Sequence, residues 1–359
     1  MTAESGPDLH TLVVGRDAMA CRFELVFNAG EVPNATELAV EALDLVDEIE
    51  SRITVYRDSS VVARINAEAA ADWQAVPSDL FDLLLHARDL HDRTAGAFDI
   101  AAGSLVRTWG FLRRQGRTPS DEELARARES AGMRWVELDP EGRRLRFTRP
   151  GVELNLGAIG KGWALDRMIE LLRESGVASA LVHGGSSSVR AIGIQGPDVP
   201  GRSGWRVGLR HPSRPDRRLA TITLRDRALG TSGSGTQFFI DRGRKLGHIL
   251  DPRSGVPAEG VLSATVVAAS AADADALATA LYVLGPEGLE RLAIGQAVGD
   301  PRPGAAFDAD GTVRADTAIG AVLVLPGRTA GSVRLLTANL DADTLVVECG
   351  EGVEVVRVI

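Results

Sequence analysis

The chain has 359 residues, of which 44% are hydrophobic, 25% charged and 4% aromatic, a composition typical of globular proteins with an aliphatic core. The formal net charge of -9 argues against nucleic acid as the main partner, because phosphate backbones are bound by basic surfaces. It does not exclude a nucleotide ligand, since a metal ion and backbone N–H groups hold a diphosphate even in an acidic protein.

The N-terminal segment 1–14 begins with polar residues and is expected to be disordered. No apolar signal-peptide region, lipid-anchor cysteine or transmembrane run is visible, so we expect no membrane span and a cytoplasmic location. Cys21 and Cys349 lie far apart and match no metal-binding spacing, which indicates no disulfide framework.

Hydrophobic periodicity predicts the elements of the first half of the chain. In chain order they are a strand at 22–27, helices at 36–51 and 78–93, a short helix opened by the capping box of Ser120 and Glu123, and a hairpin at 135–147.

The second half alternates strands and helices around glycine-rich turns. We expect a strand at 152–156, a helix at 161–174, strands at 178–182, 205–209 and 219–224, a hairpin at 237–250, a strand at 264–269 and a helix at 274–284. Residues 301–359 carry short β-rich runs between turns, which predicts a C-terminal β-rich extension. Helices and antiparallel strands mix without strict strand–helix alternation, so the fold class is α+β.

Asp275 and Thr279 form the sharpest local signal for chemistry. They lie one helical turn apart at the start of a predicted helix, so their side chains share a face. A carboxylate and a hydroxyl on one face suit a hard cation such as Mg²⁺. An aspartate near a helix N-terminus is also a common cap or dipole partner, and from this motif alone capping is the commoner role.

A glycine-rich turn precedes the helix at 161–174 in the run LNLGAIGKG. Such a turn lets the backbone approach a phosphate, and the helix N-terminus favours an anion. It is not a Walker A motif, because Gly162 follows Lys161 where a serine or threonine is required. A plain tight turn is the alternative.

His248 begins the run HILDPRSG and is a candidate general base, since the unperturbed pKa of histidine lies near neutral. The alternative is a hydrogen-bonded histidine at the end of a strand. Two weaker motifs are the glycine- and serine-rich run 230–235 and the aromatic residues near Phe98 and Asp99. The first suits a ligand cradle or a simple loop, and the second a planar ring or a hydrophobic core.

The motifs, taken in order, resemble the ApbE family of FAD:protein FMN transferases. The matching runs are SRITVYRDSSVVARIN (51–66), GAFDIAAGSLVRTWGF (96–111), LNLGAIGKGWALD (154–166), LVHGG (181–185), GWRVGLRHP (204–212), LGTSG (229–233), HILDPRSG (248–255) and DALATALYVLG (275–285). The resemblance implies an ApbE-like, T-fold-related architecture of mixed sheets with packed helices over 15–300, followed by the β-rich extension at 301–359.

The resemblance also implies roles for individual residues. The metal ligands are Asp275, Thr279 and the backbone carbonyl of Ala158, with Mg²⁺ or another divalent metal as the ion. Asp275 and His248 are the catalytic residues, and His248 activates the acceptor hydroxyl. The positions implied to contact FAD are Met19, Tyr56, Ala97, Phe98, Asp99, Asn155, Lys161 and Leu250.

The implied activity is the metal-dependent transfer of FMN from FAD to a threonine or serine hydroxyl of an acceptor flavin-carrier protein, with release of AMP. The alternatives are an FAD diphosphatase, which forms FMN and AMP, and a non-catalytic flavin-binding protein. The chain departs from the family pattern at Ala20 and Cys21, where the family has Gly-Thr after methionine, at Asn155, where it has aspartate, and at Ser186, where it has aspartate.

Overall fold

The computed structural model describes residues 10–113, 115–197, 203–233, 235, 237–293, 318–348, 350 and 352–358. The central element of this part of the chain is a nine-stranded sheet. In spatial order its strands are β1 (Thr11–Ala18), β2 (Cys21–Asn28), β6 (Ala180–Gly184), β7 (Ser188–Ile192), β10 (Ala228–Gly233), β13 (Ser263–Ala268), β14 (Gly320–Pro326), β15 (Val333–Ala338) and β17 (Val353–Arg357). Neighbouring strands are antiparallel except β15 and β17, which are parallel.

Helices cover one face of this sheet and a second sheet covers the other. The covering helices are α1 (Ala35–Ile53), α6 (Gly160–Glu174), α7 (Ala271–Leu284) and α8 (Pro286–Ala293). The second sheet has the order β16 (Leu345–Val347), β9 (Arg214–Leu224) and β8 (Trp205–His211). Because side chains alternate along a strand, Val266 packs in the helical core while Val267 packs against the second sheet.

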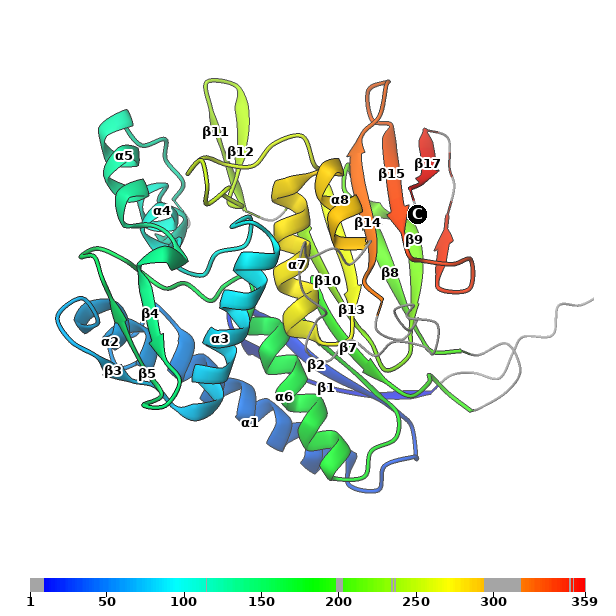
Figure 1. Ribbon diagram of the computed structural model, residues 1–359. Helices are drawn as coiled ribbons and strands as arrows, with labels where there is room; N and C mark the ends of the chain where they lie inside the picture. The colour runs from blue at the N-terminus through cyan, green and yellow to red at the C-terminus, as the bar shows by residue number, and fades with distance from the viewer. Residues whose placement is uncertain are drawn as a thin grey trace, which may run out of the picture.

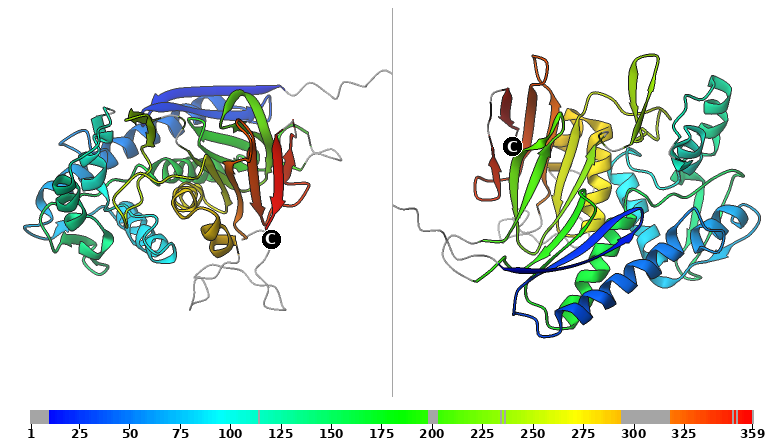
Figure 2. Two further views of the ribbon diagram at one scale, coloured as in Figure 1. Left: turned by 90° about the horizontal axis from the view of Figure 1, so that it is seen from above. Right: turned by 180° about the vertical axis from the view of Figure 1, so that it is seen from behind.

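A helical lobe lies to one side of the sheets in every view (Figures 1 and 2). It contains α2 (Val61–Glu68), α3 (Ser78–Arg93), α4 (Gly103–Thr108), the short 3-10 turns Phe111–Arg113 and Met133–Trp135, α5 (Asp121–Ser130), and a small sheet of β3 (Gln74–Ala75), β5 (Arg144–Phe147) and β4 (Val136–Asp139). The hairpin of β11 (Phe238–Asp241) and β12 (Arg244–Gly247) projects beside this lobe (Figure 1).

The predicted α+β class, with mixed sheets and packed helices, is confirmed. The predicted helices at 36–51, 78–93, 161–174 and 274–284 correspond to α1, α3, α6 and α7, and both hydrogen bonds of the predicted capping box at Ser120 and Glu123 are present. No helix in the described part of the chain is long and apolar enough to cross a membrane.

Two expectations need correction. Residues 11–14 belong to β1, which pairs with β2 along its whole length, so the disorder expected for 1–14 extends too far; residues 1–9 lie outside the described part. The strand expected at 152–156 is absent apart from a single bridge at Glu153. The backbone of Leu154 bonds instead to the side-chain amide of Asn66, at 2.7 Å and 2.9 Å, so no regular ladder forms.

The C-terminal strands continue the main sheet, since β14 pairs directly with β13. Leu323 of β14 lies in the same hydrophobic core as Val266 of β13. The boundary expected near residue 300 falls in the segment 294–317, outside the described residues, and stays a prediction.

The first turn of α7 is approached unusually closely by two other elements. A Cβ added to Gly162 of α6 would lie 2.0 Å from the carbonyl oxygen of Ala271, and one added to Gly230 of β10 would lie 2.3 Å from that of Ala274. Real Cβ atoms do not come this near to backbone oxygens, so both positions require glycine. These contacts fix where α7 sits on the sheet.

Replacement of Gly230 by alanine is therefore expected to lower the free energy of unfolding by about 1–3 kcal/mol, because the overpacked methyl group must push α7 away from β10. Urea denaturation of the purified variant measures this. Gly350→Ala is the matched control, since no described atom lies within 4 Å of its added Cβ, and its effect should stay within about 0.5 kcal/mol. Equal effects of the two substitutions would contradict the close-approach argument.

Candidate active site

Asp275 lies in the first turns of α7 and is almost completely buried, with 6% of its surface exposed. Its Oδ2 accepts a hydrogen bond of 2.9 Å from the backbone N–H of Gly162 and lies 3.8 Å from Nζ of Lys161. Burial raises the pKa of Asp275, while Lys161, Ser188 and the Gly162 N–H act in the opposite direction. A buried carboxylate with one nearby cation gains strongly from a further positive charge.

Thr279 lies one turn further along α7 and is half-buried. Its hydroxyl donates to the carbonyl of Asp275 at 3.1 Å and lies 3.0 Å from the hydroxyl of Ser232 at the end of β10. The close packing of α7 against β10 thus brings the GTSG run beside the helix. The Ser232 contact orients the Thr279 oxygen.

The carbonyl of Ala158 lies just before α6, which begins at Gly160. The first N–H groups of a helix have no partner within it, and the N–H of Gly162 in α6 is one of these. That N–H is donated to Asp275, and no hydrogen bond to the Ala158 carbonyl is found among the described residues. Ala158 is partly exposed, and none of the described residues competes with a ligand for its oxygen.

These three oxygen donors fit a divalent cation of the Mg²⁺ type. Mg²⁺ commonly takes one or two carboxylates and completes its coordination with water and substrate phosphates. The described residues contain no group of three or more His, Cys, Asp or Glu side chains that could hold a metal ion. A cation at Asp275 and Thr279 would therefore draw part of its coordination from a bound diphosphate.

His248 follows β12 and is held at its Nδ1 atom. The carbonyl of Gln237 lies 3.0 Å from Nδ1 and also accepts the backbone N–H of His248 at 3.2 Å. Because a carbonyl only accepts, Nδ1 carries the proton, and Nε2 of the neutral ring has a free lone pair. No hydrogen-bond partner of Nε2 is found in the described part of the chain. Burial lowers the pKa of His248, and Lys161 lowers it further.

Lys161 carries a positive charge that affects several neighbouring groups. Besides its contact with Asp275, it lowers the pKa of His248 and opposes the burial that raises the pKa of Cys21. Cys21 lies next to Gly185, whose added Cβ would be 3.3 Å from that of Cys21. The charge of Lys161 therefore acts on groups from the start of β2, from α7 and from the His248 loop.

Met19 and Ala20 form the two-residue turn between β1 and β2, with φ angles of 48° and 61°. Positive φ at both positions is the geometry of the tight hairpin turns that favour glycine or asparagine. The N–H of Met19 donates to Glu50 at 2.8 Å, which ties this turn to α1. The position where the family has glycine is thus strained when it carries Ala20.

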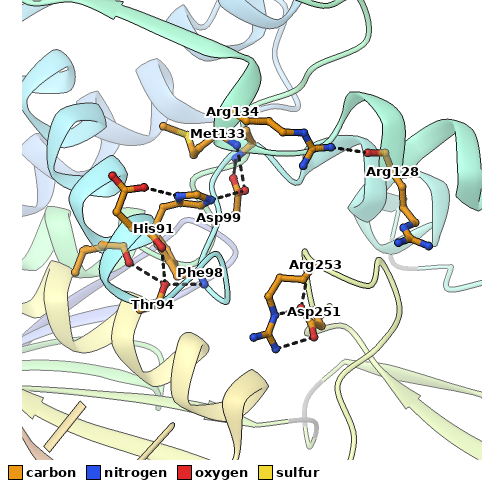
Figure 3. A network of polar contacts seen from close by, with 12 residues as sticks. His91, Thr94, Phe98, Asp99, Arg128, Met133, Arg134, Asp251 and Arg253 are labelled. Carbon is orange, nitrogen blue, oxygen red and sulfur yellow. Dashed lines mark hydrogen bonds and ion pairs between the residues drawn. The ribbon is translucent and has the colours of Figure 1, made fainter. Parts of the chain in front are cut away.

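Ala97, Phe98 and Asp99 lie in the helical lobe, between α3 and α4. The side chains of Ala97 and Phe98 are buried in the core. Asp99 accepts the N–H groups of Ala101 at 2.7 Å and Met133 at 3.1 Å, and lies 3.4 Å from His91 (Figure 3). Asp99 thus holds its own loop in place. Any FAD contact at Ala97 or Phe98 would be made mainly through the backbone.

The remaining predicted FAD positions differ in exposure. Tyr56 is 70% exposed, whereas Leu250 is buried in a cluster with Leu105 and Trp109. Asn155 is half-buried, and its side-chain oxygen accepts the N–H of Gly157 at 2.9 Å. The neutral amide therefore shapes the glycine-rich turn locally.

Several residues that position the site were not predicted. Asp166 of α6 accepts the N–H groups of Ala271 and Ala272 at 2.8 Å and 2.9 Å, so it caps α7 while Asp275 of α7 accepts from α6. Burial raises the pKa of Asp166 to about 6. Asp166 ends one of the matching runs and Ser232 lies in another, so the sequence contained a signal for both; Ser188 carried none.

Residues 19–298 of the chain match the ApbE family. The chain belongs to the ApbE family. The resemblance inferred from its ordered motifs is thereby confirmed.

Individual members of the ApbE family are similar to this chain over most of their length. FAD:protein FMN transferases of Treponema pallidum and Vibrio cholerae are 33% and 32% identical to this chain, over 72% and 71% of it and 74% and 76% of their own lengths. Among solved structures, the ApbE protein of Thermotoga maritima has a TM-score of 0.74 at 28% identity, covering 88% of this chain and 94% of that one. The apo flavinyl transferase ApbE of Pseudomonas stutzeri has a TM-score of 0.74 at 27% identity, covering 92% and 94%.

An ion pair ties the helical lobe to the N-terminus of α7. Nε2 of His86 in α3 lies 2.7 Å from Asp273, and this hydrogen bond raises the pKa of His86. In the unfolded chain His86 titrates near pH 6.5 (about the unperturbed value). The contact therefore stabilises the folded protein fully below that pH. This stabilisation is lost as the pH rises through the higher pKa that His86 has in the folded protein.

His86→Gln is accordingly expected to destabilise the protein by about 0.5–1 kcal/mol at pH 6 and by less at pH 9, a magnitude limited by partial exposure of the pair. Urea denaturation at the two pH values measures the difference. His10→Gln, at an exposed position before β1, serves as control and should show no such trend. A destabilisation by His86→Gln that does not change with pH would exclude a charged pair.

Proposed function

We propose that this ApbE-family chain transfers FMN from FAD to a threonine or serine hydroxyl of an acceptor protein and releases AMP. Its family membership and the names of its relatives support this activity. The observation that carries the proposal is the hydrogen bond that the backbone N–H of Gly162 donates to Asp275. It orients one buried carboxylate, which lies one helical turn before Thr279 and 3.8 Å from the cation Lys161.

Asp275, Thr279 and the carbonyl of Ala158 would hold the divalent cation. When bound, such a cation supplies positive charge against the diphosphate and offsets the charge that develops as a P–O bond breaks. Lys161 adds a second positive charge from the first turn of α6, where the helix N-terminus itself favours an anion. The residues of this chain thus bind and orient the diphosphate.

His248 provides the acid–base step. Its Nε2 takes the proton of the acceptor hydroxyl, whose oxygen bonds to the phosphorus on the FMN side. The bond from that phosphorus to the bridging oxygen breaks, and AMP leaves with the electron pair. The Gln237 carbonyl holds the ring in the tautomer that this step needs, and the lowered pKa of His248 keeps Nε2 unprotonated near neutral pH.

The assay incubates the purified protein with FAD, Mg²⁺ and a candidate acceptor. Covalent FMN on the acceptor, detected by in-gel fluorescence and mass spectrometry, together with AMP supports the transferase. AMP without labelling supports the diphosphatase alternative, and tight FAD binding without AMP supports a non-catalytic flavin-binding protein.

In this assay Asp275→Asn should lower metal-dependent turnover by about 100-fold or more. The amide still offers an oxygen to Gly162 but lacks the negative charge that binds a cation. Asp82→Asn, at an exposed position on α3, is the matched control and should be as active as the original protein. Full activity of Asp275→Asn would remove this residue from the metal site.

His248→Asn should slow transfer by about 10²–10⁴-fold while the dissociation constant of FAD changes little. In the original protein kcat/KM should fall only below about pH 6.5, because burial lowers the pKa of His248 and the base is lost when Nε2 is protonated. His211→Asn, which replaces a histidine outside the site whose pKa is also lowered by burial, is the control. Equal losses of FAD binding and transfer in His248→Asn would make His248 a binding residue.

A further inference from the structure

The β11–β12 hairpin has one face anchored to the helical lobe. Phe239 packs against the rings of Trp109 and Phe111, at centroid distances of 6.3 Å and 5.8 Å. Leu246, its cross-strand partner, is also buried. This inner face accounts for the hairpin's attachment to the protein.

The opposite, outer face of the hairpin carries Phe238 and Ile240. These side chains are 45% and 70% exposed, although they lie on a projecting two-stranded element. Lys245, the cross-strand partner of Ile240, lies with its ammonium 4.1 Å from the centre of the Phe238 ring. Large apolar side chains grouped on a projecting element are typical of a surface that binds another protein.

The charge of the hairpin restricts the partner. Arg242 and Lys245 are exposed and form no ion pair within the described residues, while Asp241 is engaged with Thr118 at 2.9 Å. The tip is therefore positive in a chain whose net charge is -9. A second copy bound face to face would oppose like charges, whereas an acidic partner with apolar side chains would complement the surface.

The base of the hairpin connects the outer face to His248, the proposed general base. Gln237 directly precedes β11 and holds His248, which directly follows β12. The His248 ring lies 6.4 Å from that of Phe111, against which Phe239 of the inner face also packs, so His248 lies on the inner side of the hairpin. A protein bound to the outer face would touch the histidine only through a segment that passes the base of the hairpin.

We propose that the outer face of the β11–β12 hairpin is the docking surface for the acceptor protein, an acidic polypeptide with apolar side chains that pack on Phe238 and Ile240 and carboxylates near Arg242 and Lys245. This inference rests on the proposed transferase function. It separates docking of the acceptor from the reaction of its hydroxyl at His248, so the two are affected by different substitutions.

The test measures steady-state transfer with the full chain, FAD, Mg²⁺ and a labelled acceptor. The double variant Phe238→Ser/Ile240→Ser should raise the KM for the acceptor by about 10-fold or more, with kcat and the FAD dissociation constant unchanged. Lys245→Glu should raise the same KM, and added salt should raise the KM of the original protein. Val355→Ser/Val356→Ser, which replaces two exposed apolar residues of β17, is the control and should leave KM unchanged.

An unchanged KM in the Phe238→Ser/Ile240→Ser variant would overturn the proposal. So would a dimer in size-exclusion chromatography that this variant dissociates while KM stays the same, because the face would then bind a second copy. A loss of FAD binding in the variant would assign these residues to the flavin site instead. If the original protein labels no acceptor at all, the proposed function fails, and that result is distinct from all of these.

Discussion

The first turns of α6 and α7 each use a carboxylate of the other helix. Asp275 of α7 takes the N–H of Gly162, and Asp166 of α6 takes those of Ala271 and Ala272. Helix N-termini leave such N–H groups without partners, and here two helices satisfy each other. The glycine at 162 is what lets them approach, because any side chain would collide with the carbonyl of Ala271.

These reciprocal hydrogen bonds determine the chemistry available around Asp275. A carboxylate buried beside one lysine remains short of positive charge, so burial raises the pKa of Asp275 even against Lys161 and the surrounding donors. Burial of the Asp275 carboxylate costs desolvation free energy, and a bound cation would offset that cost. Structural stability alone would be served as well by an apolar residue, and this favours a ligand-binding role for Asp275.

Much of this arrangement could be predicted because short, local sequence patterns determine it. Helical periodicity placed Asp275 and Thr279 on α7, and the ordered glycine-rich runs indicated the family. The sequence was less informative where bonds join distant segments. Asn66 supplies the hydrogen bonds that replace the strand expected at 152–156, and no local pattern marks that amide as the partner of Leu154. Ser188 was missed for the same reason.

The bond between Gly162 and Asp275 joins positions 113 residues apart in the sequence. During synthesis on a ribosome, the glycine-rich turn emerges long before the strand and helix that complete it. The site proposed for the diphosphate is therefore incomplete until α7 has been made and packed. Polypeptides cut short before that helix contain most of the recognisable motifs and yet lack the carboxylate around which they are arranged.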